Sequence, residues 1–66
     1  MIKETYYSFK VAYDEGYQMA NKNFNVKADS LELAYDKVID LASQKLDLNR
    51  VSFIEYEGKD TFELYN

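Results

Sequence analysis

The chain of 66 residues contains no cysteine, no histidine and no proline, and it has only two glycines. Without cysteine and histidine, neither disulfides nor a structural zinc site can stabilise the fold, so the packing of apolar side chains must do so. The same absence excludes nucleophilic catalysis by a Cys–His or Ser–His pair. Isolated glycines also exclude a glycine-rich phosphate loop. We therefore expect no enzyme.

A long apolar run is also missing. No segment approaches the roughly 18 apolar residues that a membrane helix needs, and the first residues contain no apolar signal-peptide region. The lack of cysteine fits a reducing compartment, so we expect a cytoplasmic location without membrane contact. Lysine far outnumbers arginine, and asparagine and tyrosine are frequent. This composition is typical of an AT-rich coding sequence and favours a bacterial or phage source.

Basic residues are fewer than acidic ones, 8 against 12, which gives a net charge of -4. A negative charge favours solubility and opposes contact with phosphate backbones. Lys10 and Lys22 lie near tyrosines and suggest a stacking platform for single-stranded nucleic acid. Because Arg50 is the only arginine, the positive field is too small, and we do not expect nucleic acid as a partner.

What the chain does contain is apolar and aromatic: 47% hydrophobic residues, with seven Tyr and four Phe. This is enough for one core, so residues 1–66 form a single domain. Residues 6–13 alternate with a period of two, which predicts a strand with one aromatic face made of Tyr7, Phe9, Val11 and Tyr13.

The turn Asp14-Glu15-Gly16 should reverse the chain into a second strand from Gln18 to Lys27. A four-residue loop, 14–17, would place Ala20, Phe24 and Val26 opposite Val11, Tyr7 and Thr5. A three-residue loop would instead turn Asn21 and Asn23 inward and bury amides without partners, so the longer loop is preferred.

From Asp29 to Asp47 the apolar period changes to 3.6, which predicts an amphipathic helix. Asp29 and Glu32 have the spacing of a capping box, and Asn49 can adopt a left-handed cap after the helix. The predicted core stripe consists of Leu31, Ala34, Tyr35, Val38, Ile39, Leu41, Ala42 and Leu46.

The last segment suggests a second hairpin, from Val51 to Tyr56 and from Thr61 to Tyr65, with a turn at residues 57–60 around Gly58. A two- or four-residue loop puts Phe53 opposite Leu64. A five-residue loop instead brings Ile54 and Tyr56 together with Phe62 and Leu64, and the sequence leaves both registers open.

These elements predict an α+β fold, a two-layer ββαββ sandwich with a four-stranded, mainly antiparallel sheet and one helix packed on one face. The order of elements is similar to the β-grasp layout of small bacterial immunoglobulin-binding domains. No motif in this chain carries the binding residues of those domains.

Two surfaces are candidates for binding a partner. Glu32, Asp36 and Asp40 repeat at i, i+4 spacing with Asp47 in the same sector, which makes either a solvated helix face or a docking strip for a basic protein. The sheet face away from the helix would present Tyr6, Tyr17, Met19 and Tyr65, with Ile54 and Tyr56 or Phe53 added according to register. This face would contact a partner or a second copy, or its tyrosines would pair only with neighbouring strands.

The remaining candidate for chemistry is the carboxylate pair Glu55 and Glu57, which we interpret as solvated charges near Lys59. Residues 57–60 lack the alternating acids of a calcium loop. No catalytic, cofactor-binding or metal-ligating residue is predicted, and no cofactor. The sequence favours a non-enzymatic protein-interaction module, such as a small inhibitor or adaptor of a nucleic-acid-binding protein. The alternatives are a structural domain that homodimerises through its sheet and a weak single-stranded nucleic-acid binder.

Overall fold

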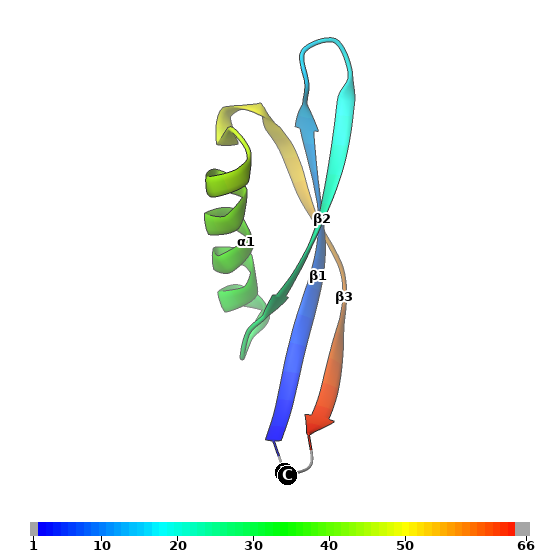
Figure 1. Ribbon diagram of the computed structural model, residues 1–66, viewed down its shortest axis with the longest axis vertical. Helices are drawn as coiled ribbons and strands as arrows, with labels where there is room; N and C mark the ends of the chain where they lie inside the picture. Colours follow the sequence, from blue (N-terminus) through cyan, green and yellow to red (C-terminus); the bar gives the residue numbers. More distant parts are fainter. Residues whose placement is uncertain (1, 65–66) are drawn as a thin grey trace.

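The computed structural model describes the backbone of residues 2–64 and the side chains of residues 3–63. Three strands and one long helix make up these residues (Figure 1): β1 (Ile2–Asp14), β2 (Met19–Lys27), α1 (Leu31–Lys45), a short 3₁₀ helix η1 (Leu48–Arg50), and β3 (Val51–Leu64). The sheet has the order β2-β1-β3, and β1 is antiparallel to both neighbours. The chain is thus an α+β fold with one helix on a three-stranded antiparallel sheet.

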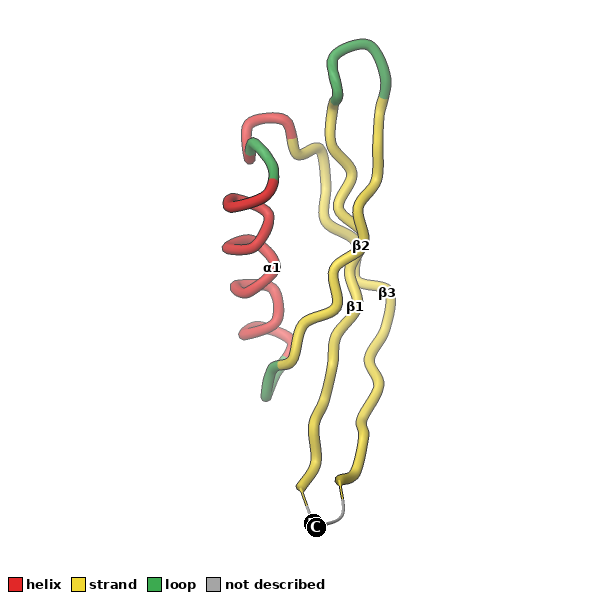
Figure 2. The backbone as a smooth tube through the Cα atoms, in the orientation of Figure 1, coloured by secondary structure: helices red, strands yellow, loops and turns green. Residues whose placement is uncertain are grey.

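The helix α1 connects the two edge strands and packs over β2 and β1. Figure 2 shows α1 standing to one side of the sheet, with the tip of the β1–β2 hairpin above it and the paired ends of β1 and β3 below it. The core lies between α1 and the sheet. Its largest fully buried side chains, Phe9, Val11 and Val38, come from the centre of β1 and the middle of α1.

The four-stranded sheet and the β-grasp-like layout predicted from the sequence are wrong, because the second hairpin does not form. Residues 51–64 are one strand that pairs with β1 along its whole length. Ser8 pairs with Gly58 and Phe9 pairs with Tyr56, so Glu57 is an extra residue in β3. Gly58 has a φ of +141°, the conformation that glycine supplies at a bulge as readily as at a turn. The glycine therefore bends β3 instead of reversing it.

The first hairpin has the predicted four-residue loop length, but the loop is shifted by one residue. Asp14 pairs with Met19, so the loop contains residues 15–18 and the pairs are Phe9 with Phe24 and Tyr7 with Val26. The shift keeps the side of the sheet to which each residue points, and Phe24 and Val26 are buried as expected. The Asp14 carboxylate accepts a hydrogen bond from the Gly16 N–H at 2.8 Å, which stabilises the start of the loop.

The helix is shorter at both ends than the predicted range from Asp29 to Asp47. Ser30, not Asp29, is the N-cap, and its Oγ accepts a hydrogen bond from the Leu33 N–H at 3.2 Å. At the other end Leu46 has an extended conformation, and no non-glycine residue described has a positive φ, so Asn49 is not a left-handed cap. Ala34, Val38 and Ala42 form the buried stripe, whereas Leu31 and Ile39, which we expected in the core, are exposed.

Candidate protein-interaction surfaces

The outer face of α1 carries three exposed carboxylates, Glu32, Asp36 and Asp40, on successive turns. Each step of four residues advances about 6 Å along the helix axis. Within residues 2–64, no ion pair joins any of the three to a lysine or arginine; the ion pairs found there lie elsewhere. The Asp40 carboxylate accepts a hydrogen bond from the Gln44 amide at 3.4 Å. These three predicted residues therefore form one open acidic strip.

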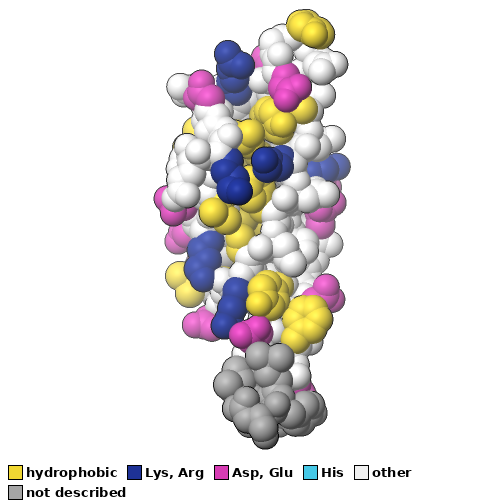
Figure 3. Space-filling view, in the orientation of Figure 1, with side chains coloured by type: hydrophobic (Ala, Val, Ile, Leu, Met, Phe, Trp, Pro, Cys, Tyr) yellow, Lys and Arg dark blue, Asp and Glu magenta, His cyan; other side chains and the backbone are white. Residues whose placement is uncertain are grey.

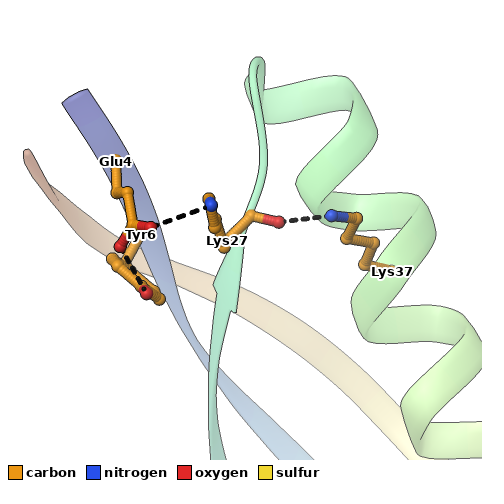
Figure 4. Close-up of polar contacts among 4 residues, drawn as sticks. All are labelled: Glu4, Tyr6, Lys27 and Lys37. Atoms are coloured by element: carbon orange, nitrogen blue, oxygen red, sulfur yellow. Dashed lines mark hydrogen bonds and ion pairs between the residues drawn. The ribbon is translucent and has the colours of Figure 1, made fainter. Parts of the chain in front are cut away.

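Lys37 is the lysine in the middle of α1. It lines the groove between α1 and β2 together with Asp40, but within residues 2–64 it forms no ion pair with the strip. Its ammonium donates a hydrogen bond to the backbone carbonyl of Lys27 at the end of β2 (Figure 4). Figure 3 shows several Lys and Arg side chains along the middle of the face in view, with acidic side chains at both lateral edges and also beside the basic ones near the lower end. The Lys37 ammonium is thus bonded to the edge of the sheet and not to the acidic strip.

Two aliphatic side chains lie on either side of the acidic strip. Leu33 is 49% exposed and Ile39 is 44% exposed. At 100° per residue, Leu33 lies on one side of Asp36 and Asp40 and Ile39 on the other. The sequence interpretation missed this arrangement because it assigned Ile39 to the core. The available signal was Leu33, an apolar residue outside the predicted core stripe.

Asp47 does not belong to the acidic strip. It follows the end of α1 and caps η1, where its carboxylate accepts a hydrogen bond from the Asn49 N–H at 3.0 Å. The Nε of Arg50 lies 4.0 Å from the same carboxylate. The role of Asp47 in this connection is structural, because it stabilises the turn between α1 and β3.

The centre of the sheet face away from α1 is polar. Asn21, Asn23 and Asn25 alternate along β2 and are exposed, and the Ser8 hydroxyl donates to the Asn25 side-chain oxygen at 3.3 Å. On the β3 side, Lys10 forms an ion pair with Glu55 at 3.3 Å. This polar centre divides the aromatic face that we expected into two separate ends.

At one end of this face lie Met19 and Phe53, which are 57% and 52% exposed. They lie near the β1–β2 loop, whose Tyr17 is 95% exposed and projects beyond the sheet. Of the residues that depended on register, Phe53 is on this face. Ile54 and Tyr56 pack against the core beneath α1. Tyr65, the remaining predicted residue, lies outside the described residues.

At the other end Tyr6 and Phe62 pack edge to face with ring centroids 5.7 Å apart. The Tyr6 hydroxyl donates to the Glu4 carboxylate at 3.0 Å, and the other oxygen of that carboxylate accepts from Lys27 at 3.0 Å (Figure 4). Lys27 and then Tyr6 lower the pKa of Glu4 by bonding its charged form. The same contacts raise the pKa of Lys27 and of the Tyr6 hydroxyl.

A shallow groove of about 360 Å³ lies between β2 and α1. Val26 and Leu41 supply its apolar lining, and Lys27, Lys37 and Asp40 its charged groups. Lys37 is already bonded to the Lys27 carbonyl in this groove. This hydrogen bond links α1 to the edge of the sheet. The residues that line the groove do not include a nucleophile placed beside a base.

The other residues considered for chemistry are not brought together. Glu55 pairs with Lys10 on the open face, whereas Glu57 is the extra residue of the bulge, so the two carboxylates do not share the regular alternation of a strand. Lys10 and Lys22 point to opposite faces, because Lys22 pairs with Val11 and Lys10 with Asn23. This separation removes the basis for a nucleic-acid stacking platform built on these two lysines.

Among the described residues, no cluster of three or more acidic side chains is arranged to hold a metal ion. The one long helix described, α1, is too short and too polar to cross a bilayer. Comparisons with protein-family models, with curated proteins and with solved structures found no significant match to this chain.

Proposed function

We propose that this chain is a non-enzymatic protein-interaction module that binds a basic partner protein through the outer face of α1. The observation that carries the proposal is the strip of Glu32, Asp36 and Asp40, which has no basic partner within residues 2–64 and is bordered by exposed Leu33 and Ile39. Interfaces commonly combine an apolar contact with a charged rim, and this face supplies both.

The arrangement of charge is more than helix stability requires. Like charges at i, i+4 spacing destabilise a helix by a few tenths of a kcal/mol per pair, and only Glu32 lies in the first turn, where the helix dipole offsets this cost. A complementary basic surface would turn the repulsion into attraction and would accelerate association at low salt. A nucleic-acid-binding protein suits this strip, because regularly spaced carboxylates present charge as phosphates do. An inhibitor or adaptor of bacterial or phage origin is the setting that we propose.

Photo-crosslinking from position 33 would identify the partner. A photoreactive phenylalanine analogue replaces Leu33 on the helix face, and in a matched control it replaces Asn23 on the polar sheet face. The purified protein is irradiated in a cell extract, and adducts specific to position 33 are identified by mass spectrometry. The proposal requires an adduct to a protein with a basic surface that is absent from the position 23 control.

The identified partner is then purified, and its affinity is measured for wild type, for Asp36→Lys with Asp40→Lys, and for Glu15→Lys with Glu57→Lys. Both double variants change the net charge equally, but only the first changes the helix strip. We expect the helix variant to bind at least about tenfold more weakly at low salt, and the control to stay within about twofold. Equal affinities for the two double variants would overturn the proposal.

A further inference from the structure

The pairing of β1 with β3 continues past the end of β2. Tyr6 pairs with Lys27 at the last position of β2, whereas β1 and β3 stay paired from Thr5 with Thr61 to Ile2 with Leu64. In Figure 1 this two-stranded end extends below both α1 and β2. An isolated pair of strands is marginally stable in water, so this end gains most from additional strands.

The outer edge of β3 offers backbone groups for such a strand. The Ala28 N–H donates to the Thr5 carbonyl at 3.1 Å, so the backbone of Thr5 faces the β2 side. The backbone N–H and C=O groups of successive residues in a strand point to opposite sides, so those of Glu4 and Tyr6 face β3. They bond to the backbone of their partners, Phe62 and Asp60. The intervening residues of β3, at 59, 61 and 63, therefore direct their N–H and C=O groups away from the sheet. No strand within residues 2–64 pairs with that edge.

The edge of β2 is not equivalent. The carbonyl of Lys27 there is occupied by Lys37, and α1 packs beside the strand. A second copy on that edge would bring two acidic helix faces towards each other. The lower half of β3 has neither obstacle, since α1 packs on β2 and β1.

We propose that the segment 58–64 of β3 pairs antiparallel with the same segment of a second copy of this chain, about a two-fold axis at Thr61. This register places Lys59 opposite Glu63 of the second copy, and Glu63 opposite its Lys59. Asp60 faces Phe62 of the second copy. Lys59 forms no ion pair within residues 2–64, and Glu63, which lies 3.8 Å from Lys3, would join a network of three charges.

Neighbouring registers lack this complementarity. An axis at Asp60 places Asp60 opposite Asp60 and Glu57 opposite Glu63, and an axis at Lys59 places Lys59 opposite Lys59. Like charges directly opposite each other destabilise paired strands. An axis at Phe62 places Glu63 opposite Thr61 and so removes the Lys59–Glu63 pairs between the copies. The charges of β3 therefore select one register.

The open face supports the same register. Phe62 is 51% exposed and packs on Tyr6. Pairing about Thr61 makes the two copies of Phe62 diagonal neighbours, which lie about 7–8 Å apart in antiparallel strands and are within reach for aromatic rings. The result is a row of four rings, Tyr6 and Phe62 from each copy. The row converts two exposed strand pairs into one four-stranded sheet end.

Sedimentation equilibrium and light scattering over a concentration series test this pairing. Wild type should be a dimer. Thr61→Pro removes an N–H that points away from β1, so the fold should survive while dimerisation weakens at least about tenfold. Lys59→Glu and Glu63→Lys should each weaken it similarly, because each places like charges opposite each other in the dimer. Lys22→Glu on β2 is the control for the charge change.

Mixing the two charge variants gives the sharpest result. Lys59→Glu and Glu63→Lys restore opposite charges only when they pair with each other. An equimolar mixture should therefore form a heterodimer at concentrations where each variant alone is monomeric. Circular dichroism confirms that each variant is folded. A monomeric wild type at millimolar concentration, or a dimer unaffected by Thr61→Pro and by both charge variants, would overturn the proposal. The proposal is independent of α1, so its failure would leave the proposed function untouched.

Discussion

The ring of Tyr35 on α1 lies against the ring of Phe9 at the centre of β1, with centroids 4.9 Å apart and planes inclined by 60°. Phe9 is fully buried, pairs with Phe24 on β2, and has the Tyr56 ring of β3 at 5.6 Å. The four long elements therefore meet at this one side chain.

Replacing Phe9 should destabilise the domain more than any surface change. Phe9→Ala leaves a cavity that costs about 3–5 kcal/mol, against a total stability of roughly 3–10 kcal/mol for a domain of this length. We expect the variant to be largely unfolded. Phe9→Leu should stay folded and lose about 1–2 kcal/mol in urea unfolding. Tyr17→Ala at the exposed loop tip is the control, and an equal loss there would contradict the importance assigned to Phe9.

The sequence predicted the parts of this fold that depend on local periodicity. The alternation of Tyr7, Phe9 and Val11 gave the correct buried face, and Ala34 and Val38 lie in the predicted helix stripe. The period of side chains is set by backbone geometry, so it can be read without knowing the neighbours. The same holds for the exposure of the acidic helix face.

The sequence could not predict which strand each residue of the last segment would pair with. Gly58 suits both a turn and a bulge, and the choice depends on whether β1 is long enough to pair with all of β3. The first four residues of β1 decide this, because Ile2 to Thr5 pair with Thr61 to Leu64. The predicted first strand began at Tyr6 and therefore missed the partner. Non-local pairing also explains why the free edge of β3 could not be foreseen.

Nuclear Overhauser effects distinguish the bulged strand from a hairpin. Thr5 and Thr61 are a non-hydrogen-bonded pair, whose Cα atoms lie about 4.5 Å apart, so we expect a strong contact between their Hα protons. The two Oγ1 atoms lie 3.2 Å apart. Contacts between Phe53 and Leu64, or between Tyr56 and Phe62, without the Thr5–Thr61 contact would instead indicate one of the two hairpin registers.

Gly58→Ala should destabilise the fold without any steric clash. An added Cβ would have no heavy atom within 4 Å, so the cost comes from the φ of +141°, a backbone conformation that residues other than glycine rarely adopt. We expect a loss of about 1–3 kcal/mol in urea unfolding. Lys22→Ala, an exposed strand position on β2 outside the segment 58–64, should change stability by less than about 0.5 kcal/mol. Similar values for the two variants would contradict a positive-φ bulge at Gly58.

Ser30 and Asp29 provide a matched test of the helix start. Ser30→Ala removes the acceptor for the Leu33 N–H and should cost about 1 kcal/mol. Asp29→Ala should cost less than about 0.5 kcal/mol, because Asp29 is not the N-cap. Urea unfolding of both variants measures the difference. A larger loss for Asp29→Ala would support the cap predicted from the sequence instead.

The contact between Glu4 and Lys27 should make stability depend on pH in a defined direction. Lys27 and Tyr6 lower the pKa of Glu4 in the folded state. The stabilisation is therefore present above the unfolded pKa of Glu4 and is lost as the pH falls through the lowered, folded value. The raised pKa of Lys27 has the opposite sign: its stabilisation is present below the unfolded value and is lost as the pH rises through the folded one.

Glu4→Gln should remove this pH dependence in both the acidic and the alkaline range. The difference in melting temperature between wild type and variant should therefore be largest near neutral pH and shrink in acid. Glu32→Gln on the helix is the control for loss of one exposed carboxylate. A ¹³C titration of the Glu4 carboxyl separates the causes, since Lys27→Gln should move its pKa up towards the ordinary value. Because the Lys27 hydrogen bond is the larger cause and the Tyr6 hydroxyl the smaller, Tyr6→Phe should move it less. An unchanged titration in Lys27→Gln would mean that the ion pair does not persist in solution.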